Sequence, residues 1–257
     1  MKNRSLLVVL LLFAMVCAVT NGCSDQSQQT DSDPDPAAGN EANPNHDSAS
    51  DSDGKVKPDS EVTATEPLEA KALLVGGLGD WKPIGFGGEG EVYFEDGALN
   101  LDYGNPLTGV KYRGDMAELL GEDLDNYRIT LQAQRVEGID IFLGVTFPVG
   151  QAGHVSLVLG GWAGAITGIS NLDGLNASEN KTTQYHAFED KKWYTVKIEV
   201  TIKKIQCWLD DKQLVDVNRA DYTKYDTHGA VVDTIPFGMF SYGTWGKVKD
   251  VRVVKLD

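Results

Sequence analysis

The 257-residue chain has few of the side chains that usually hold metal ions. Its three cysteines and four histidines are scattered, and they do not have the spacing of a zinc site. Asn171–Gly174 and the pair Asp210 and Asp211 could supply oxygen ligands, but neither has the spacing of a calcium loop and both fit turns. The chain also lacks a phosphate-binding loop, a nucleophile elbow and a dinucleotide fingerprint. We therefore predict no metal and no cofactor.

The sequence also predicts no clustered basic face on the folded domain. The formal net charge is −15, and residues 24–67 contribute −9 of it through eight Asp and three Glu against two Lys. Nucleic acids and anionic lipids attract proteins through clustered Lys and Arg. The composition therefore argues against nucleic acid as a partner, and most of the acidity belongs to the amino-terminal segment.

The apolar run near the amino terminus is too short to span a membrane. It extends from Leu6 to Ala18 and follows the basic residues Lys2 and Arg4. This pattern is typical of a signal peptide, which we place at residues 1–22. We therefore expect the protein to be exported.

Cys23 follows a glycine and precedes a polar low-complexity segment, an arrangement that resembles a bacterial lipoprotein processing site. Thr20 stands where such sites usually have Leu, so ordinary signal cleavage without an anchor is the alternative. Acylation of Cys23 would attach the protein to a membrane of the cell envelope.

Residues 23–70 are rich in Asp, Ser, Gln, Asn and Pro and have almost no large apolar side chains. Such a segment cannot bury enough surface to offset the entropy of the chain, so we predict a disordered acidic linker. The folded domain is placed at residues 71–257. Without disulfides it must be stabilised by its hydrophobic core, for which about 190 residues are ample.

The folded region has short alternating segments separated by Gly, Asn and Asp, which indicates an all-β domain. The clearest strand is Trp193–Thr201, and hairpin turns are predicted at residues 95–97 and 210–211. Cys207 alternates with apolar neighbours, which predicts a small buried residue rather than a nucleophile. About a dozen strands require two packed sheets, because one sheet would leave an apolar face exposed.

The segment Arg135–Asn180 is predicted to carry the binding surface. Alternation over residues 139–147 places Ile139, Ile141, Leu143, Val145 and Phe147 on the core face and Asp140, Phe142, Gly144 and Thr146 on the other. A second strand over residues 154–162 places Ser156, Gly160 and Trp162 on one side. We expect an aromatic side chain and small residues to line a groove there.

Several stretches carry a family resemblance. In the carboxy-terminal third they are WYTVKIEVTIKKIQCWLDDKQLVDV and FGMFSYGTWGKVKDVRVVKL, which resemble the concanavalin A-like lectin/glucanase superfamily. Within it, EDGALNL, IDIFLGVTFPVG, GGWAGAITGIS and NASENKTT resemble the 3-keto-disaccharide hydrolase domain family, also described as family 16 glycoside hydrolase-like. The resemblance extends over Leu73–Asp257 and implies a two-sheet jelly-roll β-sandwich whose concave sheet faces carbohydrate.

Paired catalytic carboxylates are absent. Glucanases of this superfamily use an E-x-D-x-x-E strand, and the chain has no E-x-D. The resemblance to the 3-keto family implies other chemistry, because a ketone at C3 acidifies the hydrogen at C2 and one base could then start expulsion of the glycosidic oxygen. We take Asp140 and His186 as candidate catalytic residues, although each could instead have a structural or surface role.

Four residues are predicted to bind substrate: Phe142, Thr146, Trp162 and Glu179. Trp162 could stack on a sugar ring or cap the core. The leading hypothesis is an exported, envelope-anchored domain that engages carbohydrate. An active 3-keto-glycoside hydrolase and a non-catalytic structural or protein-interaction sandwich are the alternatives.

Overall fold

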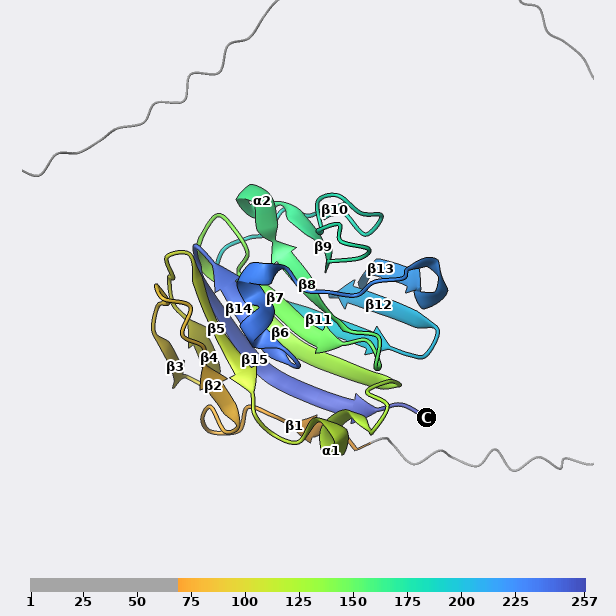
Figure 1. Ribbon diagram of the computed structural model, residues 1–257. Coiled ribbons are helices and arrows are strands. Elements are labelled where there is room, and N and C mark those ends of the chain that lie inside the picture. Colours follow the sequence, from red (N-terminus) through yellow and green to blue (C-terminus); the bar gives the residue numbers. More distant parts are fainter. Residues whose placement is uncertain (1–68) are drawn as a thin grey trace, which may run out of the picture. The chain divides into compact units, whose positions relative to one another are not determined.

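Two antiparallel β-sheets make up the part of the chain that the computed structural model describes, residues 69–257 (Figure 1). The eight-stranded sheet contains, in spatial order, β13 (Lys212–Asn218), β12 (Lys204–Leu209), β11 (Trp193–Val200), β6 (Tyr127–Gly138), β15 (Thr244–Lys255), β4 (Ala98–Leu101) and β3 (Val92–Glu95), with β1 (Lys71–Ala72) paired to β15. The seven-stranded sheet contains β10 (Gln184–Tyr185), β9 (Ile166–Ser170), β8 (His154–Gly160), β7 (Leu143–Pro148), β14 (Gly238–Tyr242), β5 (Leu107–Tyr112) and β2 (Trp81–Pro83). The predicted all-β two-sheet sandwich is confirmed.

Four short helical segments connect the strands: α1 (Met116–Leu120), α2 (Gly161–Gly164) and the 3-10 helices η1 (Arg219–Asp221) and η2 (Gly229–Thr234). No helix within residues 69–257 is long and apolar enough to cross a membrane. The predicted signal peptide, Cys23 and nearly all of the predicted linker lie outside the described residues.

The main hydrophobic core lies between the sheets and follows from alternation along the strands. β11 buries every second residue, and β6 does so from Tyr127 to Ala133. Apolar side chains such as Ile129, Leu131, Val196 and Ile198 therefore face inward while polar ones face outward. Cys207 is fully buried in this core, as predicted, and burial raises the pKa of its thiol well above the usual range. The thiol is therefore a packing group.

The strand predicted over residues 139–147 is wrong in its first half. β6 ends at Gly138, which has φ 121°, and β7 begins only at Leu143. A backbone at such a φ strongly favours glycine, and it breaks the alternation. Ile139 is therefore 74% exposed instead of buried, and Phe142 is fully buried in the core instead of facing the groove. From Leu143 onward the predicted alternation is correct.

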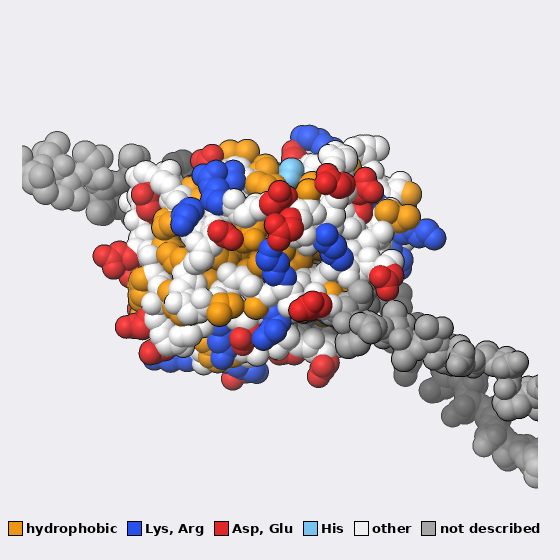
Figure 2. Space-filling model, turned by 90° about the horizontal axis from the view of Figure 1, so that it is seen from below, with side chains coloured by type: hydrophobic (Ala, Val, Ile, Leu, Met, Phe, Trp, Pro, Cys, Tyr) orange, Lys and Arg blue, Asp and Glu red, His pale blue; other side chains and the backbone are white. Residues whose placement is uncertain are grey.

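The surface of the domain mixes charges on the face seen in Figure 2, where basic and acidic side chains are interspersed among hydrophobic ones. Residues 69–257 contain 19 Lys and Arg against 27 Asp and Glu, a formal charge of −8. The domain as a whole is thus acidic.

Candidate functional site

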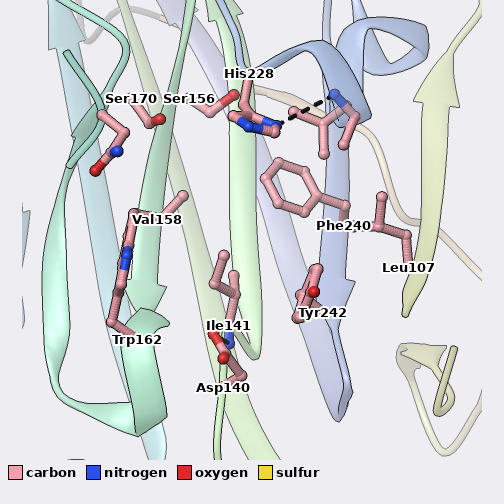
Figure 3. Close-up of a pocket in the computed structure, with 13 residues that line it drawn as sticks. Leu107, Asp140, Ile141, Ser156, Val158, Trp162, Ser170, His228, Phe240 and Tyr242 are labelled. Carbon is pink, nitrogen blue, oxygen red and sulfur yellow. Dashed lines mark hydrogen bonds between the residues drawn. The ribbon is translucent and has the colours of Figure 1, made fainter. Parts of the chain in front are cut away.

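A pocket of about 420 Å³ opens on the outer face of the seven-stranded sheet, the face that points away from the main core (Figure 3). Its lining comes from four strands and four connections, and includes Leu107, Asp140, Ile141, Ser156, Val158, Trp162, Ser170, Asn176, His228, Ala230, Val231, Phe240 and Tyr242. Apolar side chains form most of this lining, with a few polar groups among them. Such a combination is usual in small-molecule sites.

Glycine makes room for the pocket floor. A Cβ atom at Gly144 would lie 2.2 Å from Cζ of Phe240, so the Phe240 ring can lie across β7 only because residue 144 has no side chain. Phe240 is almost fully buried and packs with Leu107 and Val158 in a second, smaller apolar cluster under the pocket. The floor is thus an aromatic ring held in one orientation by its neighbours.

Trp162 forms one wall of the pocket. It lies in α2, immediately after β8, where Gly160, Trp162 and Ala163 have φ values of 78°, 50° and 64°. These left-handed conformations are uncommon for residues with side chains and cluster at functional sites. The turn leaves Trp162 42% exposed, and Figure 3 shows its ring on the side of the pocket opposite Tyr242. Trp162 therefore lies at the predicted groove, although in a turn and not in a strand.

Asp140 is the one carboxylate in the pocket lining, and no Lys or Arg lines the described pocket. Its backbone N–H donates to Oγ1 of Thr244 over 3.0 Å, and its Oδ1 accepts from the N–H of Ile141 over 2.9 Å. The described residues supply no hydrogen bond to Oδ2. One carboxylate oxygen is therefore available to a ligand hydroxyl or to a proton.

His228 also lines the pocket, and the sequence analysis missed it. It caps η2, where its Nδ1 accepts from the N–H of Ala230 over 3.2 Å, so the proton of the neutral ring resides on Nε2. Figure 3 places His228 at the opposite end of the pocket from Asp140. No local motif marks His228, because η2 is brought to the pocket by packing against β5 and β14.

Two predicted site residues lie away from the pocket cavity. Thr146 is fully buried, where its Oγ1 bonds to Oγ of Ser156 over 2.8 Å and to Oγ1 of Thr234 over 2.6 Å. Thr146 lies on the predicted face of β7, but η2 covers that part of the face. Phe142 lies in the main core against Phe188. Neither residue is accessible to a substrate.

Glu179 and His186 also lie outside the lining. Glu179 is exposed and accepts from the backbone N–H of Asn176 over 3.2 Å, so it holds a lining residue in place. His186 contacts the rings of Phe188 and Tyr194 at centroid distances of 4.5 and 5.9 Å. Burial, helped by Lys212, lowers the pKa of His186. The structure therefore does not bring His186 together with Asp140.

No group of three or more metal-ligating His, Cys, Asp or Glu side chains occurs within residues 69–257. The pocket chemistry available from the chain is thus one carboxylate, one imidazole, hydroxyl and amide groups, and two aromatic side chains at the mouth.

A comparison with known protein families identifies the family of this β-sandwich domain. The model of the 3-keto-alpha-glucoside-1,2-lyase-like domain matches residues 77–254, which is most of the chain and nearly all of the described part. The chain belongs to this family. The resemblance found in the sequence is therefore confirmed, and Asp140, Trp162 and His228 all lie within the matched family domain. No curated protein matches the chain.

Solved structures with similar sandwiches include three bacterial carbohydrate-related proteins. One is the carbohydrate-binding module CBM66 of Bacillus subtilis, with 9% identity, a TM-score of 0.47, and coverage of 68% of this chain and 96% of that chain. A putative glycosyl hydrolase of Parabacteroides distasonis has 13% identity, a TM-score of 0.48, and coverage of 73% and 94%. Domain 4 of an extracellular GH43 arabinanase of Geobacillus stearothermophilus, solved with arabinotriose, has 13% identity, a TM-score of 0.44, and coverage of 69% and 82%.

Proposed function

We propose that the pocket on the outer face of the seven-stranded sheet binds a carbohydrate, with Trp162 as its stacking platform. The observation that carries this proposal is the strained turn that holds a half-exposed tryptophan at the pocket wall. The C–H face of a pyranose is apolar and packs on an aromatic ring. The hydroxyls of the sugar need a few placed polar partners, which Asp140, Ser170 and Asn176 supply around an apolar floor.

The charge of the pocket supports an uncharged sugar as its ligand. Asp140 is its one carboxylate and no cation lines the pocket in the described chain, so a sugar acid would bring an unpaired negative charge to the site. The name of the family makes 3-keto-α-glucosides the first ligands to try.

Trp162→Ala is expected to weaken binding of a 3-keto-α-glucoside by about tenfold, because removal of the stacking face costs about 1.4 kcal/mol. The measurement is an equilibrium titration of the wild type and the variant. Tyr185→Ala is the matched control, since Tyr185 is an aromatic residue that is 75% exposed and does not line the pocket. Equal affinities in wild type and Trp162→Ala would contradict the proposal. If the wild type binds no glycan, a structural or protein-interaction role would be favoured.

A second candidate is catalysis of 1,2-elimination from 3-keto-α-glucosides, which the family membership and the available Asp140 oxygen favour. In this reaction a base takes the acidic proton from C2. The C–H electron pair forms the C1=C2 double bond as the bond from C1 to the aglycone oxygen breaks, and that oxygen takes up a proton. We assign the base to Asp140.

Asp140→Asn is expected to lower the rate of elimination by about 100-fold or more, because the amide cannot accept the proton. Release of the aglycone from a chromogenic 3-keto-α-glucoside measures the rate. Binding of the same sugar should change much less, which separates loss of the base from loss of the site. Wild-type turnover in Asp140→Asn would remove this assignment.

We further propose that the protein is exported and held at the cell envelope by a lipid on Cys23. The pattern of residues 1–22 and the glycine before Cys23 support this proposal. Cys23→Ser is expected to move the protein from the membrane fraction to the soluble fraction on cell fractionation. Unchanged membrane association of the variant would rule out this anchor.

A further inference from the structure

The outer face of the eight-stranded sheet carries three partly exposed tryptophans, one each on β11, β12 and β15, which the pocket does not use. Each has a lysine ammonium over its ring. The distances from Nζ to the ring centroid are 3.7 Å for Lys197 over Trp208, 4.3 Å for Lys249 over Trp193 and 5.6 Å for Lys247 over Trp245. Cation–π contact therefore fixes these ammonium groups at defined places on the sheet.

The strand register gives the spacing of this outer Trp/Lys face. One row across β11, β6 and β15 contains Lys197, Thr130 and Arg252, the next contains Thr195, Gln132 and Lys249, and the third contains Trp193, Gln134 and Lys247. Rows on one face are about 7 Å apart, and residues two strands apart are about 10 Å apart. Cations thus run along β15 from Lys247 to Arg252, with Lys197 across β6 from them.

The charges of β15 on this face are not neutralised by the described chain. Lys247, Lys249 and Arg252 make no ion pair among the described residues, and Asp250, in the bulge between them, pairs with neither neighbour. The face also has the carboxylates Glu199, Asp216 and Glu137. Glu199 and Asp216 already pair with cations on their own strands or on a neighbouring one, and Glu137 lies opposite Trp245 without an ion pair among the described residues. Six cations on this face outnumber the three carboxylates: Arg128, Lys197, Lys204, Lys247, Lys249 and Arg252. The outer Trp/Lys face is therefore net positive on a domain whose formal charge is −8.

We propose that this face binds a linear polysaccharide that carries carboxylates, such as a uronic acid polymer. Sugar rings can pack on the lysine stems and on the parts of the tryptophan rings that the lysines leave exposed, while the carboxylates pair with the cations of β15. The amides of Gln132 and Gln134 lie in the middle of the rows, where they can bond to hydroxyls. The formal charge of −8 on the whole domain disfavours the denser charge of a nucleic acid backbone.

This ligand differs from that of the pocket, and the two surfaces lie on different sheets. The pocket has a carboxylate and no cation, whereas the outer Trp/Lys face has uncompensated cations. Lys247, Lys249 and Arg252 are close in the chain, whereas β11 adds Lys197 and Trp193 to the same face only because β6 pairs with both strands. Two separate glycan contacts would let one chain hold a polymer and a small sugar at once.

The test is a titration of the full chain with polygalacturonate at fixed ionic strength, with dextran as the neutral polymer and poly(dT) as the anionic nucleic acid. The wild type is expected to bind polygalacturonate and not dextran. Lys247→Glu/Lys249→Glu is expected to weaken this binding by about tenfold, because two exposed ion pairs with polymer carboxylates become two repulsive contacts. The matched control is Lys82→Glu/Lys181→Glu, which changes the net charge equally at exposed sites on other elements and should remain within about twofold of the wild type.

Trp193→Ala should weaken the same binding by about fivefold, and Trp193→Phe should restore most of it, because a ring and not only charge contributes. Trp162→Ala should leave binding of polygalacturonate unchanged, which keeps this test separate from the test of the pocket. The proposal is overturned by a wild type that does not bind polygalacturonate, by equal losses in the two charge variants, or by tighter binding of poly(dT) than of polygalacturonate.

Discussion

Gly144→Ala is expected to weaken ligand binding in the pocket by about 30-fold, which corresponds to about 2 kcal/mol. The added Cβ would lie 2.2 Å from Cζ of Phe240, so the ring has to leave its place on β7. Main-core residues pack beneath the sheet, and the open side is the pocket. The Phe240 ring should therefore swing into the space that the ligand needs. A titration with a 3-keto-α-glucoside measures the effect.

A compensating variant separates this mechanism from general damage. In Gly144→Ala/Phe240→Leu the smaller side chain at residue 240 leaves room for the new methyl group, so most of the binding should return. The free energy of unfolding of Gly144→Ala should fall by less than the binding does, because the ring tip can move outward. Full binding in Gly144→Ala would show that Phe240 does not form the floor of the binding site.

Asp125→Ala is expected to lower the free energy of unfolding by about 3 kcal/mol, which is the cost of breaking a buried ion pair. The guanidinium of Arg219 pairs with Asp125 and also donates to the carbonyls of Thr201 over 2.7 Å and Val149 over 3.2 Å. The two charged side chains are only 13% and 14% exposed. Loss of the carboxylate leaves a buried cation without its counter-charge. Denaturant unfolding of the two proteins measures the difference.

The double variant Asp125→Leu/Arg219→Met is the control for this pair. It removes both charges, so it should be less destabilised than the sum of the two single variants. Arg219 joins the end of β13 to the connections that contain Asp125 and Val149, which fixes one end of the sandwich. A loss below about 1 kcal/mol in Asp125→Ala would mean that water screens this pair as it screens surface pairs.

Local alternation allowed much of the fold to be predicted. β11 runs over Trp193–Val200, one residue short of its prediction, and the hairpins around residues 95–97 and 210–211 both form. Each depends on contacts between residues close in the chain. The burial of Cys207 followed from the same period of two.

The break after β6 depends on distant residues and was missed. A Cβ at Gly138 would lie 2.8 Å from Cα of Thr244, so the positive φ of Gly138 is tied to the close approach of β15, about a hundred residues later. With the strand interrupted there, Phe142 turns into the core and Ile139 turns outward. Alternation within one segment cannot reveal such a constraint.

The candidate site was predicted in part. Asp140 and Trp162 both line the pocket, and the alternation of side chains had placed both at a groove. Trp162 reaches the pocket from a left-handed turn instead of a strand. His186, the other candidate catalytic residue, lies outside the pocket lining and packs on Phe188. The histidine that lines the pocket is His228. It reaches the pocket because η2 folds over the seven-stranded sheet, an arrangement that depends on tertiary packing.

The most direct test of carbohydrate binding in the pocket is an NMR titration that follows the indole N–H signals of the five tryptophans. A 3-keto-α-glucoside is added to the protein, and the signal of Trp162 is assigned by its loss in Trp162→Phe. The Trp162 signal is expected to shift until the protein is saturated, whereas the signals of Trp193, Trp208 and Trp245 on the other sheet are expected not to move. A shift confined to those three signals, or an unmoved Trp162 at saturating ligand, would contradict the account.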